Sequence, residues 1–307
     1  LLDAVVNVGN GALLAVYNKT IYAIDVATGV ASVITTVPAT VGGVTTGTVN
    51  NSLAIDYTNG LIYYTDASTA NSKALFAYNY VTNAHILIDS NITNNGAGLS
   101  VTSPGSVGGG GAAFHNGALY LSIENTGLGG VTGADSIYRI TFSGGGTTIA
   151  GVTTFVSAVS GGADWGDIVI DSANNALISI AANSAGTRTF IRYDLTTGAQ
   201  LSSTPFAPTQ NQGGSDLGGV FWAVGGTSIQ RINPLSGAAI GAAISVTTDG
   251  TTPITGTAAD AASFVPITGS IGDRIFDDDD ADGVFDATET GIANVTVQII
   301  DDVDGDG

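Results

Sequence analysis

The chain has 307 residues, 44% of them hydrophobic, which is enough apolar material to build a core and excludes a disordered protein. It contains 44 glycines and no cysteine or methionine, which excludes disulfides and thiolate metal ligands. Its 26 acidic and 7 basic residues argue against nucleic-acid binding, which needs clustered lysines and arginines, and make cations the natural partners.

The acidic residues are concentrated at the C-terminal end of the chain. Residues 1–265 contain 14 acidic and 6 basic residues, a net charge of −8. Residues 266–307 contain 12 acidic residues and 1 basic residue, a net charge of −11. We therefore predict two domains, 1–265 and 266–307, that differ in composition.

The first residues, Leu1, Leu2 and Asp3, include neither an initiator methionine nor a basic leader. No apolar run reaches the length that is needed to cross a bilayer. We expect a mature, processed chain.

One phrase recurs five times within residues 1–265: an apolar alternating run, then Asp or Asn, two residues, Thr or Ser, and Gly. In the first copy Asp25 precedes Thr28 and Gly29, and two of the later copies are degenerate. The phrase predicts a strand that enters a tight turn, in which the Asx side chain accepts a backbone N–H two residues on and the last residue has positive φ. The copies are residues 22–29, 76–83, 138–145, 191–198 and 230–237.

Each phrase lies inside a unit of four expected strands. A further apolar strand follows the phrase, and two strands precede most copies, as residues 52–56 and 61–65 do around the turn 58–60. Four antiparallel strands that repeat every roughly 40 to 60 residues are typical of a β-propeller blade. We predict an all-β chain with a five-bladed β-propeller over residues 1–265, or a six-bladed one if residues 91–110 contain another blade.

The expected ring closes through the two ends of the domain. Strand 261–265 has no partner downstream, so it should pair with the strands at 13–16 and 21–24. The repeated phrases resemble the propeller-like repeat regions that precede adhesin-type modules in large bacterial surface proteins, and this resemblance supports a fold and not a function. The innermost strands are expected to begin near Asn51, Gly110, Asp164, Asp216 and Asp260.

Residues 278–289 match the calcium-loop pattern D-x-[DN]-x-[DN]-G-x₅-E at every position. Calcium prefers six to eight oxygen ligands, which carboxylates at alternate residues can supply while Gly283 permits the bend. An acidic run is more often a solvated loop, but so many carboxylates without a cation would repel one another. The flanking residues alternate as strands, which argues against a helical EF-hand. The expected ligands are Asp278, Asp280, Asp282, Val284 through its carbonyl, Asp286 and Glu289.

Residues 272–276, this loop and residues 289–299 together resemble the start of an SdrD B-type (Cna-B-like) repeat of bacterial surface adhesins. The resemblance implies an Ig-like β-sandwich that calcium stiffens and that holds adhesive domains away from the cell surface. It also implies the same six calcium ligands. Phe276 stands where that family usually has Trp, and the segment contains no Lys that could form an internal Lys–Asn isopeptide bond.

Asp302, Asp304 and Asp306 alternate with other residues like the first half of another, weaker calcium loop. About 40 residues with two or three strands cannot bury a sandwich core by themselves. We therefore expect the sandwich in residues 266–307 to be incomplete. Either the polypeptide continues, or a neighbouring subunit supplies the absent strands by β-augmentation.

Other residues allow alternative chemistry. Asn51, Asp164, Asp216 and Asp260, with Gly110 in the fifth strand, are expected at equivalent positions near one end of the channel, where lactonases and lyases of this fold hold a divalent metal. We prefer the interpretation that each Asx side chain bonds to backbone in its own loop.

We interpret the histidines and tryptophans as structural residues in preference to functional ones. His85 and His115 have no second ligand at metal spacing, and no G-x-S-x-G motif locates a nucleophile. Trp165 and Trp222 are expected to fill the space between blades, with sugar stacking as the functional alternative.

The sequence therefore predicts a secreted structural or adhesive cell-surface protein, with a propeller head on a calcium-stiffened stalk and no catalytic residues. Its expected partners are calcium, neighbouring copies or further modules of the same chain, and surface glycans or proteins, and strand exchange could make it a subunit of an extracellular filament. One alternative is a hydrolase or lyase with a metal among Asp164, Asp216 and Asp260, which requires that backbone amides do not satisfy those side chains. The other is a glycan-binding propeller.

Overall fold

The computed structural model describes residues 12–47, 50–66, 74–92, 108–124, 136–157, 164–182, 187–216, 218–256 and 258–262. The chain divides into two compact units, Leu1–Pro266 and Ile267–Gly307. All described residues belong to the first unit. The predicted calcium loop at 278–289 and the acidic residues Asp302, Asp304 and Asp306 lie outside the described residues.

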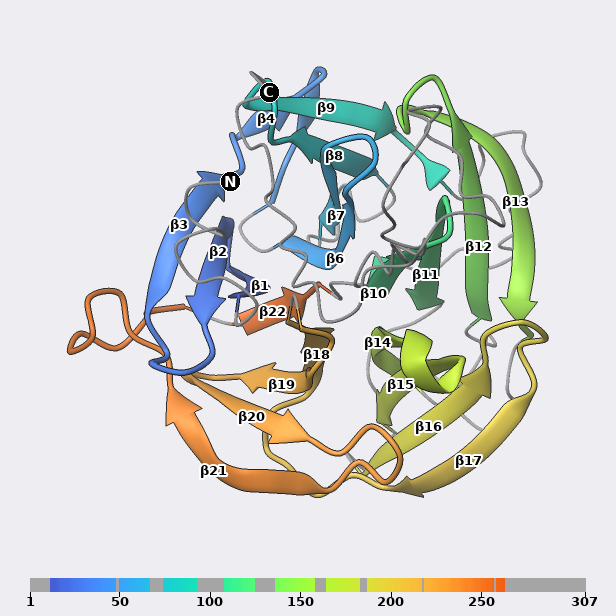
Figure 1. The fold of residues 1–307 in the computed structure, drawn as a ribbon. Coiled ribbons are helices and arrows are strands. Elements are labelled where there is room, and N and C mark those ends of the chain that lie inside the picture. The colour runs from blue at the N-terminus through green and yellow to red at the C-terminus, as the bar shows by residue number, and fades with distance from the viewer. Residues whose placement is uncertain are drawn as a thin grey trace, which may run out of the picture. The chain divides into compact units, whose positions relative to one another are not determined.

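Five four-stranded antiparallel sheets surround a common centre in the described part of the chain (Figure 1). The first blade has the strand order β22-β1-β2-β3, and the second to fifth blades are β6–β9, β10–β13, β14–β17 and β18–β21. The predicted five-bladed propeller of four-stranded meanders is thus confirmed. The region proposed for a sixth blade lies mostly outside the described residues.

In each blade the first strand given below is innermost and the last is outermost (Figure 1). A short hairpin of β4 (Thr40–Val41) and β5 (Val44–Thr45) follows the first blade, and a 3₁₀ turn, η3 (Ser172–Asn174), lies in the fourth. The blade strands are β22 (Ala258–Ala261), β1 (Ala12–Tyr17), β2 (Thr20–Asp25) and β3 (Ala31–Thr36); β6 (Asn50–Asp56), β7 (Leu61–Asp66), β8 (Leu75–Asn79) and β9 (Ala84–Asp89); β10 (Gly108–His115), β11 (Ala118–Glu124), β12 (Ser136–Ser143) and β13 (Thr148–Val156); β14 (Asp164–Asp171), β15 (Ala176–Ala182), β16 (Arg188–Asp194) and β17 (Gln200–Pro205); and β18 (Gln212–Ser215), β19 (Phe221–Gly225), β20 (Ser228–Ile232) and β21 (Ala239–Ser245).

The ring closes as expected through the first blade, which combines both ends of the propeller. β22 pairs antiparallel with β1, with Val16 opposite Asp260 and Ala15 opposite Ala261. The closing strand is Ala258–Ala261, three residues earlier than the predicted 261–265. Closure therefore joins strands about 240 residues apart and leaves no blade incomplete in the described ring.

The turns of the repeated phrase form for the predicted reason. Asp25 Oδ1 accepts the N–H of Ala27 at 2.8 Å, and Gly29 has a φ of 75°. Asn79 Oδ1 accepts the N–H of Val81 at 3.0 Å, and Asn83 has a φ of 55°. The copies at Asp194 with Gly198 and at Asn233 with Gly237 have the same bonds and the same positive φ. These side chains fix the connection between the third and fourth strands of their blades.

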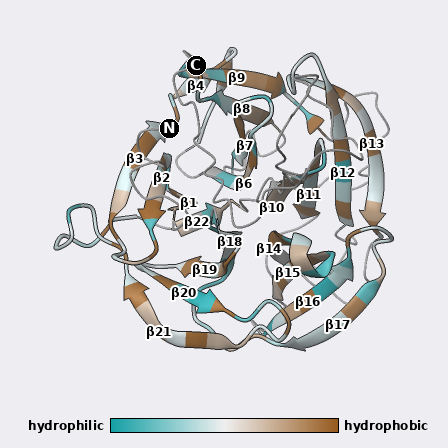
Figure 2. Cartoon of the chain, in the orientation of Figure 1, coloured by the Kyte–Doolittle hydropathy of each residue, from teal (hydrophilic) through white to brown (hydrophobic). Residues whose placement is uncertain are grey.

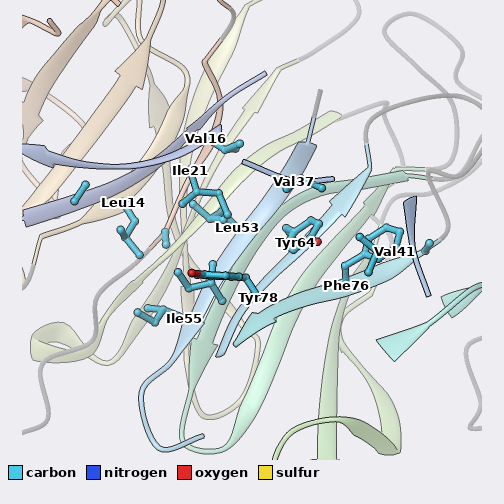
Figure 3. Close-up of a cluster of buried hydrophobic side chains, with 14 residues drawn as sticks. Leu14, Val16, Ile21, Val37, Val41, Leu53, Ile55, Tyr64, Phe76 and Tyr78 are labelled. Carbon is cyan, nitrogen blue, oxygen red and sulfur yellow. The ribbon is translucent and has the colours of Figure 1, made fainter. Parts of the chain in front are cut away.

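The hydrophobic core of the described residues consists of five clusters, and each one fills the space between two adjacent blades. Figure 3 shows the cluster between the first and second blades, which combines Leu14 and Val16 of the first with Leu53 and Phe76 of the second. Hydrophobic segments occur on strands of every blade (Figure 2). Burying one such aliphatic side chain contributes about 1.5–3 kcal/mol, so packing between the blades stabilises the ring.

Candidate functional site at the propeller axis

Four of the innermost strands have a shift in the register of their pairing with the next strand. The pairing register shifts between Asn51 and Ala54 in β6, between Gly109 and Ala112 in β10, and between Trp165 and Asp167 in β14. β22 has the same kind of shift against β1. A bulge removes a residue from the regular ladder and lets its backbone N–H point elsewhere. Here several such residues meet at the centre of the ring.

Asp167 of β14 and Asp260 of β22 meet at this centre. Both side chains are fully buried, at 0% exposure. Their carboxyl groups come from the fourth and first blades and are close enough to affect each other's protonation. The pair is therefore a polar contact across the ring.

Backbone N–H groups from four innermost strands donate to the two carboxyl groups. Asp167 accepts the Ile168 N–H through Oδ1 at 2.7 Å and the Gly213 N–H through Oδ2 at 2.5 Å. Asp260 accepts the Ala261 N–H through Oδ1 at 2.9 Å and the Leu53 N–H through Oδ2. Every carboxyl oxygen of the pair thus accepts a backbone hydrogen bond, as buried carboxylates require.

The remaining blade touches the pair through glycine. A Cβ added to Gly111 of β10 would lie 2.5 Å from Asp167 Oδ1. Gly213 and Gly214 of β18 are equally close to their neighbours, with added Cβ atoms 2.5 Å from Val169 Cγ2 and 2.7 Å from the Ala262 carbonyl oxygen. Glycine is therefore required where the backbones of the inner strands approach one another. All five blades contact the carboxyl pair or the strand that carries it.

Burial raises the pKa of the Asp167 and Asp260 carboxyl groups, because a charged carboxylate is poorly solvated at this site. The carboxylate of Asp167 raises the pKa of Asp260 further. The backbone N–H donors act in the opposite direction and only partly offset the burial. A direct bond between the two carboxyl groups requires a proton on one of them, because ionised carboxylates have only acceptor oxygens.

The five predicted channel residues do not share one environment in the structure. Asp260 lies at the axis, but its oxygens accept backbone N–H groups. Gly110 is buried in β10 and Asn51 is half-buried in β6. Asp164 begins β14 as predicted, and its side chain lies outside the described part of the structure. Only Asp260 of the five is seen in the central contact.

The prediction that an innermost strand begins near Asp216 is wrong. The innermost strand of the fifth blade is β18, which ends at Ser215, because Gly213 and Gly214 are the residues that fit against the other inner strands. Asp216 instead stabilises the loop between β18 and β19. Its Oδ1 accepts the Val220 N–H at 3.0 Å, and its Oδ2 accepts the Trp222 indole N–H at 2.9 Å.

Asp167 is the residue of the central contact that the sequence did not indicate. It lies three residues after Asp164, and the bulge between them carries its side chain to the axis. The available signal was the run of four glycines in β10 and the pair in β18, because neighbouring glycines in a buried strand indicate that another group approaches closely. That signal does not identify the approaching group.

The described residues contain no group of three or more His, Cys, Asp or Glu side chains disposed to hold a metal ion. They also contain no helix of the length and hydropathy that a membrane span needs. The predicted calcium ligands, Asp278 to Glu289, lie beyond the described ranges.

His85, His115 and Trp222 are described with their surroundings, which can be compared with their predicted structural roles. His85 joins the first two blades: its Nε2 lies 3.0 Å from Thr35 Oγ1, and its Nδ1 lies 2.8 Å from Tyr64 Oη. It is therefore a structural residue. His115 is half-buried at the end of β10. Trp222 is only 7% exposed and packs between the fifth and first blades, so its ring offers no surface to a sugar.

A surface hollow of about 350 Å³ lies at the edge of the fourth blade, lined by Arg188, Phe206 and neighbouring residues. Arg188 Nη1 donates to the carbonyl oxygens of Pro208 at 3.0 Å and Thr209 at 2.9 Å. The guanidinium thus holds the loop that forms the hollow. The hollow shares no residue with the carboxyl pair.

The sequence matches no protein-family model. It also has no match among curated proteins. Among solved structures, a gluconolactonase from Xanthomonas campestris is similar at 12% identity and a TM-score of 0.46, over 82% of this chain and 80% of that one. A luciferin-regenerating enzyme is similar at 12% identity and a TM-score of 0.38, over 79% of each chain. A Bacteroides thetaiotaomicron protein of unknown function reaches 16% identity and a TM-score of 0.40, over 66% of this chain and 47% of that one. Likenesses this distant carry no argument about function.

Proposed function

We propose that the chain is a secreted structural or adhesive cell-surface protein whose propeller is a rigid head. The observation that carries this proposal is the carboxyl pair at the axis. The oxygens of Asp167 and Asp260 accept backbone N–H groups from the propeller's own strands, so these acids hold blades together. A rigid head needs such internal bonds and no reactive group.

The second part of the proposal rests on sequence alone. Residues 278–289 would bind Ca²⁺ through the six predicted ligands and stiffen a β-sandwich segment that follows the head. Neighbouring copies or further modules of the chain would complete that sandwich, and surface glycans or proteins would be the targets of the head. This arrangement would place the protein outside the cell.

A propeller hydrolase or lyase is the second candidate. Two structural neighbours are named as a gluconolactonase and a luciferin-regenerating enzyme, but with TM-scores of 0.46 and 0.38 they do not decide between this candidate and an adhesin. A channel metal among Asp164, Asp216 and Asp260 would compete with hydrogen bonds for carboxylate lone pairs. Both oxygens of Asp216 and of Asp260 already accept hydrogen bonds within the propeller, which counts against this metal set.

Limited proteolysis of the full chain, with calcium or with EDTA, tests the proposed head and stalk. We expect EDTA to speed cleavage within residues 270–307 while the propeller, residues 12–262, resists cleavage equally in both conditions. The matched control is the double variant Asp280→Ala/Asp282→Ala, which should be cleaved in calcium as the wild type is in EDTA. Equal cleavage of residues 270–307 with and without calcium would contradict the calcium-stiffened stalk.

Hydrolysis assays test the second candidate directly. A panel of lactones and esters is incubated with the full chain and with Asp216→Asn. Turnover by the wild type that needs an added divalent metal and is lost in Asp216→Asn would replace the structural proposal with the enzymatic one. We expect no metal-dependent turnover that this substitution alters.

A further inference from the structure

Asp167 and Asp260 are two fully buried carboxyl groups that interact at the axis, and a direct bond between them requires a proton. Two ionised carboxylates offer only acceptors, so they cannot bond to each other directly. The nearby backbone N–H groups are already used, since each donates to a carboxyl oxygen. One shared proton leaves one negative charge, and four N–H groups face it: those of Leu53, Ile168, Gly213 and Ala261.

No cation on the surrounding strands could replace this proton. The five innermost strands, β6, β10, β14, β18 and β22, contain no Lys or Arg. β18 has no titratable residue, and Asp260 is the one titratable residue of β22.

The other titratable groups on these strands are engaged elsewhere or lie at strand ends. Asp56 at the end of β6 accepts from Asn59, and Asp171 at the end of β14 accepts from Asn174. His115 ends β10, and the Asp164 side chain is outside the described residues. For Asp167 and Asp260, the one ionisable side chain that shifts the pKa of each is the other member of the pair.

We propose that the Asp167–Asp260 pair is a proton-binding site at the propeller axis, and that closure of the five-bladed ring takes up one proton. The proton bonds the first blade, which carries the chain's closing strand β22, to the fourth blade. Loss of the proton would place two carboxylates in contact inside a site without a counter-charge. The ring would then open where the two ends of the domain meet, at the pairing of the four-residue β22 with β1. This inference holds whichever function the propeller has.

The direction of the pH effect follows from proton counting. In the unfolded chain both carboxyl groups are ionised above about pH 4. In the folded ring the raised pKa keeps one proton bound, so the folded state holds one proton more than the unfolded state. The stability contributed by the pair is therefore complete below about pH 4 and declines as pH rises, until the folded pair itself releases the proton.

Urea unfolding of the full chain between about pH 5 and pH 9 tests the proposal, with the wild type compared with Asp260→Asn. The Asn amide can donate to Asp167 without a titrating proton. We expect the unfolding constant of the wild type to rise about tenfold per pH unit relative to that of the variant while the proton stays bound. His85, His115 and the other carboxyl groups are common to both proteins, so their effects cancel in this ratio.

Infrared spectroscopy of the folded wild type gives a second readout that does not need a variant. A buried, protonated carboxyl group should give a C=O stretching band at neutral pH that differs from those of ionised carboxylates. Asp167→Asn should remove the band and flatten the pH dependence, as Asp260→Asn does. Parallel pH curves for wild type and variants would overturn the proposal. If neither variant folds, the absence of a carboxylic acid band in the wild type would overturn it.

Discussion

Replacing Gly111 with Ala tests whether the inner strands meet as closely as the carboxyl pair requires. The new Cβ would lie 2.5 Å from Asp167 Oδ1, 2.6 Å from Asp167 Cα and 2.8 Å from the Ile168 nitrogen. Two of these three atoms belong to the backbone of β14, which cannot rotate away as the tip of a long side chain could. The third blade must therefore move away from the axis, or the carboxyl pair must break.

Overpacking a core usually costs about 1–3 kcal/mol, and we expect Gly111→Ala to lose about 3 kcal/mol because backbone has to shift. Urea unfolding at one pH measures the loss. The matched control is Gly151→Ala in the outer strand β13, where the nearest atom, Thr141 Oγ1, would be 3.2 Å from the added Cβ. If both variants agree within about 0.5 kcal/mol, the close approach at the axis is wrong.

Three further substitutions have defined outcomes. Trp222→Phe removes the indole N–H that bonds to the buried carboxylate of Asp216, and should cost about 1–3 kcal/mol in urea unfolding; an unchanged stability would show that this bond contributes nothing. Tyr64→Phe removes the hydroxyl at His85 Nδ1 and should cost about 1 kcal/mol, and unchanged ¹⁵N shifts of the His85 ring would contradict the contact. Asp282→Ala should weaken calcium binding in isothermal titration and leave the melting of the propeller unchanged, whereas unaltered calcium binding would remove the predicted loop.

Local signals in the sequence were sufficient for the blades. Asp25 and Asn79 each stand at the end of an alternating run, with Gly29 or Asn83 four residues on, and both turns form as their side-chain chemistry requires. The closing strand could also be predicted, because an unpartnered strand at one end of a propeller domain must pair with the other end. These features depend on neighbours in sequence or on a general rule of ring closure.

The central contact could not be predicted in the same way. Gly213 donates to Asp167 from 46 residues away, and Leu53 donates to Asp260 from 207 residues away. Which acid reaches the axis is decided by the bulges in the inner strands, and a bulge changes the face of every later residue. The glycines of β18 also hide its strand pattern, so the innermost strand of the fifth blade was assigned too late in the chain.

The metal content of the purified full chain tests most directly whether the axis acids bind the blades together or bind an ion. Mass spectrometry after dialysis is applied to the wild type and to Asp280→Ala/Asp282→Ala. We expect calcium in the wild type and no divalent ion in the variant, because Asp167, Asp216 and Asp260 use their oxygens for hydrogen bonds within the propeller. One divalent ion per chain that persists in that variant and disappears when Asp260→Asn is added would contradict it.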